Sequence, residues 1–344
     1  MNKPVLILKI GSAAITTSAG QVNESAIQAI ASQLAELHPH YNILLVSSGA
    51  VATGKSFMQQ WSGSITEKKA AAAIGNPILI SLYRTAFAPH GIAIAQTLCE
   101  RQHFSQRSSF LQLRNTLSEL WKNGIIPIAN ENDVVSNLEL KFSDNDELAT
   151  LLAAGFDAEC MLMASSAGGL KDHQEQIIPR VEAINDDIMT LVRPEKSNVG
   201  LGGMVSKLTF ARLATRMGIR VVVFDLNTPH GILKAFKGET GTTFTAGKSS
   251  ASLRQKWLAS GSLVSGILYI DAGAAAALLS RKSLLAVGIS LTEGNFQKGE
   301  IVEIRKQNGA VLAVGRARYS SDELARMSEK KGMEVCHADE LVLL

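Results

Sequence analysis

Hydrophobic positions in this chain form short unbroken runs, separated by longer segments in which apolar residues recur every three or four positions. The unbroken runs predict strands buried on both faces, as in a parallel sheet. They are Val5–Ile10, Asn42–Val46, Gly91–Ala95, Ile125–Ala129, Cys160–Ala164 and Ile219–Phe224. The segments with helical spacing are Asn23–Leu37, Thr66–Phe87, Ser108–Lys122, Asp144–Ala154 and Met204–Met217. Because strands and helices alternate, the pattern predicts an α/β fold, a three-layer sandwich around a mostly parallel sheet.

The pattern changes near residue 246, which predicts a second and smaller domain. We expect a first domain over residues 1–247, a linker over residues 248–262 that is rich in Ser, Lys and Arg, and a C-terminal domain over residues 263–344. In the last segment, Asn308-Gly309 separates two strand-like stretches, which is typical of a type I′ hairpin. With one short helix at Ala272–Leu279, this domain is predicted to be mostly β.

Bulk composition excludes several classes of protein. With 46% hydrophobic and 19% charged residues, the chain can bury a large core and does not resemble a disordered protein. A net charge of +3 is too small to indicate nucleic-acid binding. The three cysteines and seven histidines lack the spacing of metal ligands. The first apolar run is short and contains Lys9, and no run approaches the ~20 apolar residues of a membrane span, so we expect a cytoplasmic protein without a membrane segment.

Two lysines mark candidate phosphate sites. Lys9 stands near the end of the first predicted strand, beside Gly11, and Lys207 follows the glycine cluster Gly200–Gly203. A cation next to backbone N–H groups that no side chain covers can neutralise a polyphosphate and donate hydrogen bonds to its oxygens. Either loop alone could be an ordinary turn with a lysine in water, but two such loops in one chain favour phosphate binding.

Polar residues also follow the later strands, at Ser47–Gly49, Asn130–Asp133 and Ser165–Ser166. Ligands of open α/β sheets bind beyond the carboxyl ends of the strands, so these segments are expected to meet Lys9 at one edge. A second polar cluster, Ser143–Asp146, opens a predicted helix. Helix capping explains part of that cluster, but the carboxylates and amides of both segments also suit the ammonium group of an amino-acid substrate.

A competing hypothesis comes from Gly49–Ser56, which matches the Walker A pattern letter for letter. A possible Walker B segment ends at Asp225, so the chain could be a P-loop NTPase that uses Lys55 and Asp225. In a P-loop the helix begins at the Gly-Lys-Ser, whereas here Ala50 and the next residues already have a helical pattern. That would leave Lys55 about one turn inside the helix. The P-loop hypothesis also gives no role to Lys9.

The motifs together resemble the amino acid kinase family over nearly the whole chain. Those that carry the resemblance are Lys9–Ser12, Ser48–Ala50 with Gly54, Ala70–Gly75, Asn130–Val135, Asp144–Asp146, and Gly202–Met204 with Lys207. The C-terminal segment is similar to a PUA domain, particularly at Val264–Ala276 and Gly294–Phe296. A kinase domain followed by a PUA domain is typical of the members that phosphorylate glutamate, whereas the acetylglutamate, aspartate and uridylate kinases lack it.

The resemblance implies the amino acid kinase fold and transfer of the γ-phosphoryl group of ATP to the side-chain carboxylate of L-glutamate, the first step of proline biosynthesis. Mg²⁺ would arrive with ATP, with no metal held directly by protein ligands. The implied catalytic residues are Lys9, Lys207 and Asp146, with Asp146 holding both ammonium groups. The implied glutamate-binding residues are Ser48, Asn130, Asp133, Asp144 and Asn145. The implied nucleotide- and phosphate-binding residues are Lys9, Gly11, Gly49, Ala50, Ser165, Ser166, Gly202, Gly203, Met204 and Lys207.

Three departures from the family pattern fall on the nucleotide side. Ser165 and Ser166 stand where the family usually carries Thr-Asp, the stretch that begins at Gly169 is shorter than usual and lacks an Asp-Pro turn, and Leu201 replaces a threonine. One interpretation is drift within a working enzyme. The alternative is a homologue that binds glutamate or proline but has impaired nucleotide binding.

The PUA-like segment raises RNA binding as a non-enzymatic alternative. From Val264 to Leu344, ten Lys or Arg stand against ten Asp or Glu, a net charge of zero. RNA binding driven by phosphate contacts needs a basic surface, so a structural or regulatory role is favoured. The family resemblance further implies a homodimer or homotetramer and feedback inhibition by proline.

Overall fold

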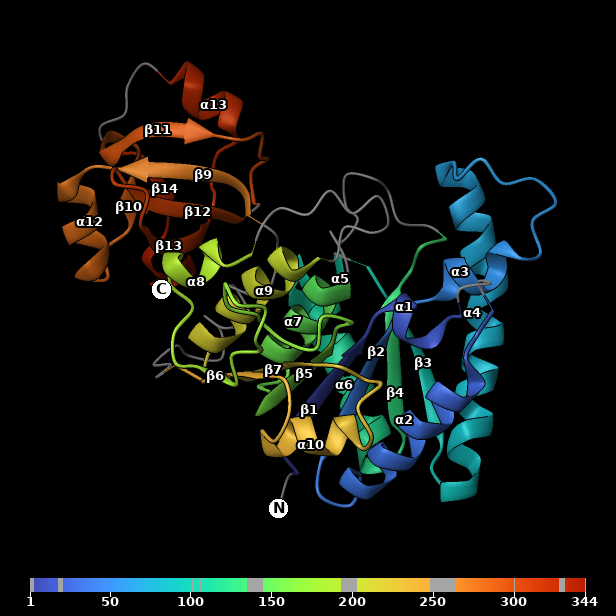
Figure 1. The fold of residues 1–344 in the computed structure, drawn as a ribbon. Helices are drawn as coiled ribbons and strands as arrows, with labels where there is room; N and C mark the ends of the chain where they lie inside the picture. The colour runs from blue at the N-terminus through green and yellow to red at the C-terminus, as the bar shows by residue number, and fades with distance from the viewer. Residues whose placement is uncertain are drawn as a thin grey trace. The chain divides into compact units, whose positions relative to one another are not determined.

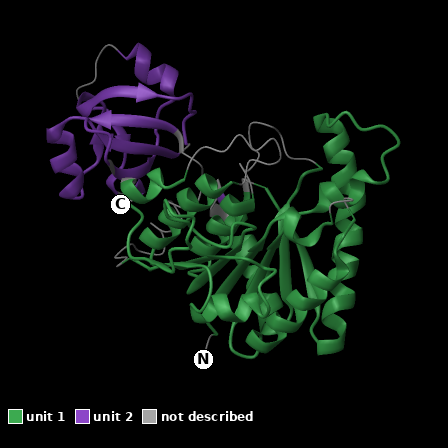
Figure 2. Ribbon diagram, viewed as in Figure 1, with its two compact units in different colours: residues 1–103, 108–249 green, residues 104–107, 250–344 purple. Residues whose placement is uncertain are grey.

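The computed structural model describes residues 3–17, 21–100, 102–105, 107–134, 145–192, 203–247, 264–299, 301–327 and 332–343. The chain divides into two compact units, residues 1–103 with 108–249 and residues 104–107 with 250–344 (Figure 2). The predicted linker over residues 248–262 lies outside the described residues, and so do Asp144 and Gly202 of the predicted site.

The first unit is built on an eight-stranded sheet with the order β3-β4-β2-β1-β5-β7-β8-β6 (Figure 1). Neighbouring strands from β3 to β7 are parallel, whereas β8 runs antiparallel to β7. The strands are β1 (Val5–Ile10), β2 (Asn42–Ser47), β3 (Ile94–Cys99), β4 (Ile126–Glu131), β5 (Cys160–Ala164), β6 (Arg180–Val181), β7 (Arg220–Phe224) and β8 (Thr242–Phe244). The predicted mostly parallel sheet is therefore confirmed.

Helices cover both faces of this sheet, which confirms the predicted three-layer sandwich. Helices α2, α4 and α10 share one hydrophobic cluster with one face of the strands, and α7 and α9 pack against β1 and β7 on the other face. The helices are α1 (Ser12–Ile15), α2 (Glu24–Leu37), α3 (Ala50–Lys55), α4 (Ile65–Phe87), η1 (Ala88–His90), α5 (Gln102–Ser105), α6 (Arg107–Lys122), α7 (Asn145–Gly155), α8 (Asp186–Thr190), α9 (Met204–Arg216) and α10 (Gly231–Lys237). Among the described helices of the chain, none combines the length and the apolar character that crossing a bilayer requires.

The alternation of β1 decides where Lys9 points. Leu6, Leu8 and Ile10 all belong to the cluster formed with α2 and α4. Because successive side chains of a strand point to opposite faces, Lys9 faces the other layer, where α7 packs against β1. A lysine in an otherwise apolar strand is thereby directed at the first turn of α7.

Two features of the sheet differ from the sequence prediction. The third strand was expected at Gly91–Ala95 and is found at Ile94–Cys99. The reason is that Gly91 has φ +67° and ends the 3₁₀ helix η1, so the apolar run begins in a turn before the strand. The antiparallel strand β8 was not predicted, because its three residues, Thr242–Phe244, are too few to show a periodic pattern.

The second unit contains a five-stranded sheet with the order β11-β9-β12-β13-β15 and a two-stranded sheet of β10 and β14. The predicted hairpin is confirmed, since β12 and β13 pair antiparallel, but its predicted type I′ turn is wrong. Gly309 has φ +82°, whereas Asn308 has no positive φ, and a type I′ turn needs a positive φ at both central residues. The elements are β9 (Val264–Ile270), α12 (Ala272–Leu279), β10 (Leu284–Leu285), η3 (Ala286–Gly288), β11 (Ile289–Glu293), β12 (Ile301–Lys306), β13 (Val311–Arg316), α13 (Ser321–Arg326), β14 (Glu334–Cys336), η4 (Ala338–Glu340) and β15 (Leu341–Leu343).

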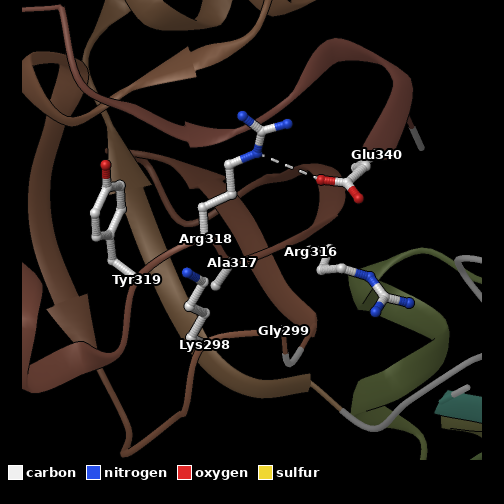
Figure 3. A pocket seen from close by; sticks show the side chains of 7 residues that line it. All are labelled: Lys298, Gly299, Arg316, Ala317, Arg318, Tyr319 and Glu340. Carbon is white, nitrogen blue, oxygen red and sulfur yellow. Dashed lines mark ion pairs between the residues drawn. The ribbon is translucent and has the colours of Figure 1, made fainter.

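A cavity of about 430 Å³ opens within the second unit (Figure 3). Its lining includes the cationic side chains of Lys298, Arg316 and Arg318 together with Glu340. Arg318 is already committed to acidic partners, because its Nη1 donates to Glu334 at 2.7 Å and its Nε lies 3.6 Å from Glu340. The positive charge of the cavity is therefore partly neutralised from within the unit.

Candidate active site

Three charged side chains meet at the carboxyl edge of the first unit's sheet. Lys9 Nζ lies 2.6 Å from Asp146 Oδ1, and Lys207 Nζ donates to Asp146 Oδ2 at 2.9 Å. The three residues come from β1, the first turn of α7 and the first turn of α9. All are buried, with 4%, 0% and 5% of Lys9, Asp146 and Lys207 exposed. The predicted arrangement, in which one carboxylate forms ion pairs with two ammonium groups, is present.

The charge of this triad suits an anionic ligand. Two ammonium groups and one carboxylate carry a net charge of plus one in a place that little water reaches. Two ammonium groups that share one carboxylate can attract a further anion. Fixed charges in a site of low dielectric also act on such an anion more strongly than they would in water.

Two short segments with glycine follow β1 and β2, at the edge of the sheet that carries the triad. Gly11 precedes α1, and a Cβ built on it would lie 3.8 Å from Lys9 Nζ. Gly49 precedes α3 with φ +112°, a conformation that L side chains rarely adopt, and an added Cβ would lie 3.1 Å from Ile15 Cδ1. Gly49 and the buried Ala50 thus carry β2 into α3 by a turn that only glycine allows. Gly11 thus lies close to Lys9.

A network of amides extends from the triad over β2 and β4. Asn145 is the residue before Asp146, and its Nδ2 donates to Ser48 Oγ at 2.7 Å and to Asn130 Oδ1 at 3.0 Å. The same Asn130 oxygen accepts from the backbone N–H of Glu131 at 2.9 Å. Asn145 Oδ1 is buried and has no hydrogen-bond partner among the described residues. Three predicted glutamate-binding residues are therefore brought together, with one acceptor still available.

One member of the network was missed by the sequence analysis. Asn76 lies inside α4, 7% exposed, and its Oδ1 accepts from Asn130 Nδ2 at 3.3 Å. Its own Nδ2 is buried without a hydrogen-bond partner in the described chain, next to a cavity of about 10 Å³ that Asn130 also lines. The available signal was an amide inside an apolar helix, directly after the Ala70–Gly75 motif.

The helix that carries Asn76 is held against α3 by two glycines. A Cβ on Gly54 would lie 1.9 Å from the carbonyl oxygen of Ala71, and one on Gly75 would lie 1.8 Å from that of Ala50. The two helices therefore touch backbone to backbone, which no larger residue would permit. This contact fixes Asn76 relative to the turn that begins α3.

The remaining predicted glutamate residues lie near or beyond the described chain. Asp133 is the second residue after β4 and is partly exposed, so it stands at the same edge as Asn130. Asp144 precedes α7 but falls outside the described residues. The expectation that both carboxylates bind the substrate stays a prediction.

The start of α9 forms the other side of the triad. Gly203 is the residue before the helix, Met204 is its first residue, and Lys207 N donates to the Gly203 carbonyl at 3.2 Å. Gly203 is exposed, and a Cβ built on it would meet no atom of the described residues within 4 Å. The first N–H groups of a helix have no partner within it and favour negative charge, so this end of α9 is suited to phosphate.

Ser165 and Ser166 occupy the turn after β5, the strand next to β1. Ser165 Oγ accepts from the backbone N–H of Ala167 at 3.4 Å, and Ser166 is exposed. Both residues therefore reach the edge at which Lys9 lies. Neither supplies the carboxylate that the family pattern would place there.

The P-loop hypothesis does not fit the geometry. Helix α3 begins at Ala50 and Lys55 is its last residue, whereas a P-loop needs the lysine at the start of the helix. Lys55 is exposed, and its Nζ lies 5.1 Å from the centre of the Trp61 ring. Lys55 thus lies on the surface, far along the helix from the turn at Gly49.

Within the described ranges, no three His, Cys, Asp or Glu side chains come together as a metal site.

Comparisons with known proteins agree with this geometry. The model of the amino acid kinase family matches residues 4–225, and that of the PUA domain matches residues 266–338. The chain is 35% identical, over an alignment of 368 residues with its gaps, to a glutamate 5-kinase of Haemophilus influenzae (strain PittGG), with 100% of each chain covered. It is also 35% identical over 365 residues to one of Dehalococcoides mccartyi (strain CBDB1), with 98% of each covered.

A solved structure adds support for the fold alone. Carbamate kinase from Giardia lamblia bound to AMP-PNP superposes with a TM-score of 0.51 at 14% identity, covering 71% of this chain and 99% of that one. The sequence match extends over the triad, the amide network and the start of α9. The chain therefore belongs to the amino acid kinase family, and it carries a C-terminal PUA domain.

Proposed function

We propose that this chain catalyses the glutamate 5-kinase reaction, transfer of the γ-phosphoryl group of ATP to the side-chain carboxylate of L-glutamate, at the start of proline biosynthesis. The observation that carries the proposal is the buried triad of Lys9, Asp146 and Lys207, which has an amide network on one side and the open start of a helix on the other. Relatives with this name match the chain from end to end.

The chemistry needs little covalent help from the protein. A carboxylate oxygen of glutamate attacks the γ-phosphorus while the bond to the bridging oxygen of ADP breaks, giving γ-glutamyl phosphate and ADP with no proton to remove. The protein's task is to bring two anions into line and to stabilise the charge that develops between them. We assign Lys9 to the transferring phosphoryl group and Lys207 to the nucleotide phosphates. Asp146 holds both ammonium groups in place.

Sheet order supports this division of the site. β2 and β4 lie on one side of β1, and β5 and β7 lie on the other. We assign glutamate to the first side, where Ser48, Asn130 and Asn145 form their network. The buried Asn145 Oδ1 is an acceptor suited to the ammonium group of an amino acid. Asp133 and Asp144 are proposed to complete that pocket.

ATP is assigned to the second side of β1. Ser165 and Ser166, with Gly202, Gly203 and Met204, are proposed to bind the nucleotide, and Gly11, Gly49 and Ala50 to donate backbone hydrogen bonds to the phosphoryl group or to the attacking carboxylate. Mg²⁺ is proposed to enter with ATP and to neutralise its phosphate charge.

The test is ADP release in the presence of candidate acceptors. We expect L-glutamate to stimulate release, and aspartate, acetylglutamate and uridylate to leave it at background. Adding hydroxylamine should trap the product as a hydroxamate, because an acyl phosphate reacts with it. Stimulation by another acceptor alone, or no hydroxamate with glutamate, would contradict the proposal.

Two partner expectations accompany the reaction. We propose a homodimer or homotetramer and feedback inhibition by proline, both on the strength of the family resemblance. Light scattering after gel filtration tests the first, and titration of proline into the glutamate-dependent assay tests the second. RNA binding by the PUA domain is not expected, and a salt-dependent shift of RNA by the full chain would contradict this.

A further inference from the structure

Asp225 stands directly after β7, beside the turn on which the family's carboxylate is missing. β5 and β7 pair in parallel with Ala164 opposite Phe224, and Ser165 N donates to the Phe224 carbonyl at 2.8 Å. Ser165 follows β5 and Asp225 follows β7, so the two residues lie at the same edge of the sheet. Because Lys9 pairs with Met163 on β5, this is the edge that carries the triad.

The side chain of Asp225 packs against that turn and is fixed by its own hydrogen bonds. A Cβ built on Gly168 would lie 3.7 Å from Asp225 Cβ, and Gly168 N closes the turn by donating to the Ser165 carbonyl at 3.1 Å. Asp225 Oδ1 accepts from Asn227 N at 2.9 Å and from Asn227 Nδ2 at 3.0 Å. Both bonds end on Oδ1, so Oδ2 of this partly exposed side chain keeps its capacity to accept.

The position of Asp225 limits what it can bind. Neighbouring strands lie about 4.8 Å apart, so β7 is roughly 10 Å from β1, with β5 between them. Phosphates placed on Lys9 and Lys207 would leave the sugar of a nucleotide farther along the edge, toward β7. A carboxylate repels phosphate but accepts hydrogen bonds from hydroxyl groups, and a ribose offers two of them.

We propose that Asp225 binds the ribose hydroxyls of ATP and so serves as a nucleotide-specificity residue in place of the carboxylate absent at Ser166. The inference rests on the proposed function for the direction in which ATP lies. It gives Asp225 a role different from the Walker B aspartate of the P-loop hypothesis. The turn bonds from Asn227 hold the carboxylate in one orientation, which lowers the entropy cost of using it.

The experiment compares binding of Mg²⁺-ATP and Mg²⁺-2′,3′-dideoxy-ATP by calorimetry, using the full chain and its Asp225→Ala and Asp225→Asn variants. We expect the wild type to prefer ATP by about tenfold, the scale of a hydrogen bond to a charged group. Asp225→Ala should bind ATP about tenfold more weakly and lose the preference. Asp225→Asn, which keeps an acceptor for the turn, should fall between the two.

Several outcomes would overturn the inference. Equal binding of the two nucleotides by the wild type would do so, and this test needs no folded variant. An unchanged preference in Asp225→Ala would do so as well, and an Asp225→Asn variant identical to the wild type would reduce the residue to a turn former. Glutamate-dependent ADP release by the wild type is measured in parallel, so failure of the proposed reaction can be told apart from failure of the ribose contact.

Discussion

The two sides of the triad are built differently. Over β2 and β4, side-chain hydrogen bonds form one connected chain from Ser48 through Asn145 and Asn130 to Asn76. Asn130 and Asn76 are buried, whereas Ser48 and Asn145 are partly exposed. Over β5 and β7, Ser166 is exposed and Asp225 is partly exposed, and Gly203 before α9 is exposed as well. We call the side assigned to glutamate closed, because its side chains are hydrogen-bonded to one another, and the side assigned to ATP open.

The difference shows where substitution is tolerated. In a connected buried network, removing one group leaves its neighbours unsatisfied at a cost of several times the value of one hydrogen bond. On the open side, a lost carboxylate can be replaced by water or by a neighbouring side chain. The departures at Ser165, Ser166 and the stretch that begins at Gly169 fall on the open side, and Leu201 lies outside the described residues. This is the distribution expected for a working enzyme, whereas impairment of nucleotide binding would require that no neighbour compensates.

The largest loss of activity is expected for a substitution of Lys9, which lies between the two sides. Replacing Lys9 with Ala removes a preorganised cation from the transferring group, and we expect kcat to fall by about 10²–10³. The matched control is Lys55→Ala, which removes an exposed lysine of the P-loop-like segment and should stay near the wild type. Steady-state ADP release measures both. If Lys55→Ala lowered kcat strongly and Lys9→Ala left it unchanged, the result would favour the P-loop hypothesis.

A smaller effect, confined to one substrate, is expected on the closed side. Asn145→Ala removes the hydrogen bonds to Ser48 and Asn130 and leaves both without their amide donor. We expect the KM for glutamate to rise by about 10–100-fold while the KM for ATP stays within about threefold, from the cost of orphaned buried polar groups. Asn123→Ala, on the exposed end of α6, is the control. Equal losses for both substrates would show that the two sides are not separate.

Asn76 tests whether the network matters beyond the residues that touch substrate. Its Oδ1 accepts from Asn130, so Asn76→Ala loosens Asn130 without removing it. We expect the KM for glutamate to rise by about three- to tenfold with kcat little changed, the value of one neutral hydrogen bond. Thermal unfolding measured alongside separates this from general destabilisation. If kcat falls and the KM does not change, Asn76 does not act by positioning the glutamate side.

The sequence predicted the features that leave a local pattern and missed those that depend on long-range packing. Parallel strands such as β1 and β5 were found because burial on both faces makes them continuously apolar. Lys9 and Lys207 were noticed because each stands beside glycines, a pattern suited to phosphate, and Asp146 was assigned to both through the family resemblance. Asn76 was missed because it meets Asn130 only through the packing of α4, 54 residues away along the chain. No local pattern carries such a contact.

Asp225 shows the opposite error, in which a residue was noticed for the wrong reason. Its place after an apolar strand matched a Walker B segment, and the pairing of β7 with β5 puts it beside Ser165 instead. Strand order decides this neighbour, and strand order depends on how distant segments pack. Sequence therefore indicated which residues are chemically notable, while topology decided which of them meet.

The smallest effect is expected from restoring the family's carboxylate on the open side. With Asp225 present, Ser166→Asp adds a second exposed acid near the first, and exposed charges interact by under about 1 kcal/mol, so ATP affinity should change by less than about fivefold. In the Asp225→Ala background the same substitution should recover part of the lost ATP affinity. It places a carboxylate at the turn that can accept hydrogen bonds from the ribose hydroxyls. Calorimetry on the four variants of this cycle measures the coupling directly. Equal effects of Ser166→Asp in both backgrounds would mean that the two positions serve different parts of the nucleotide. In that case Asp225 would not replace the carboxylate that the family pattern places at the position of Ser166.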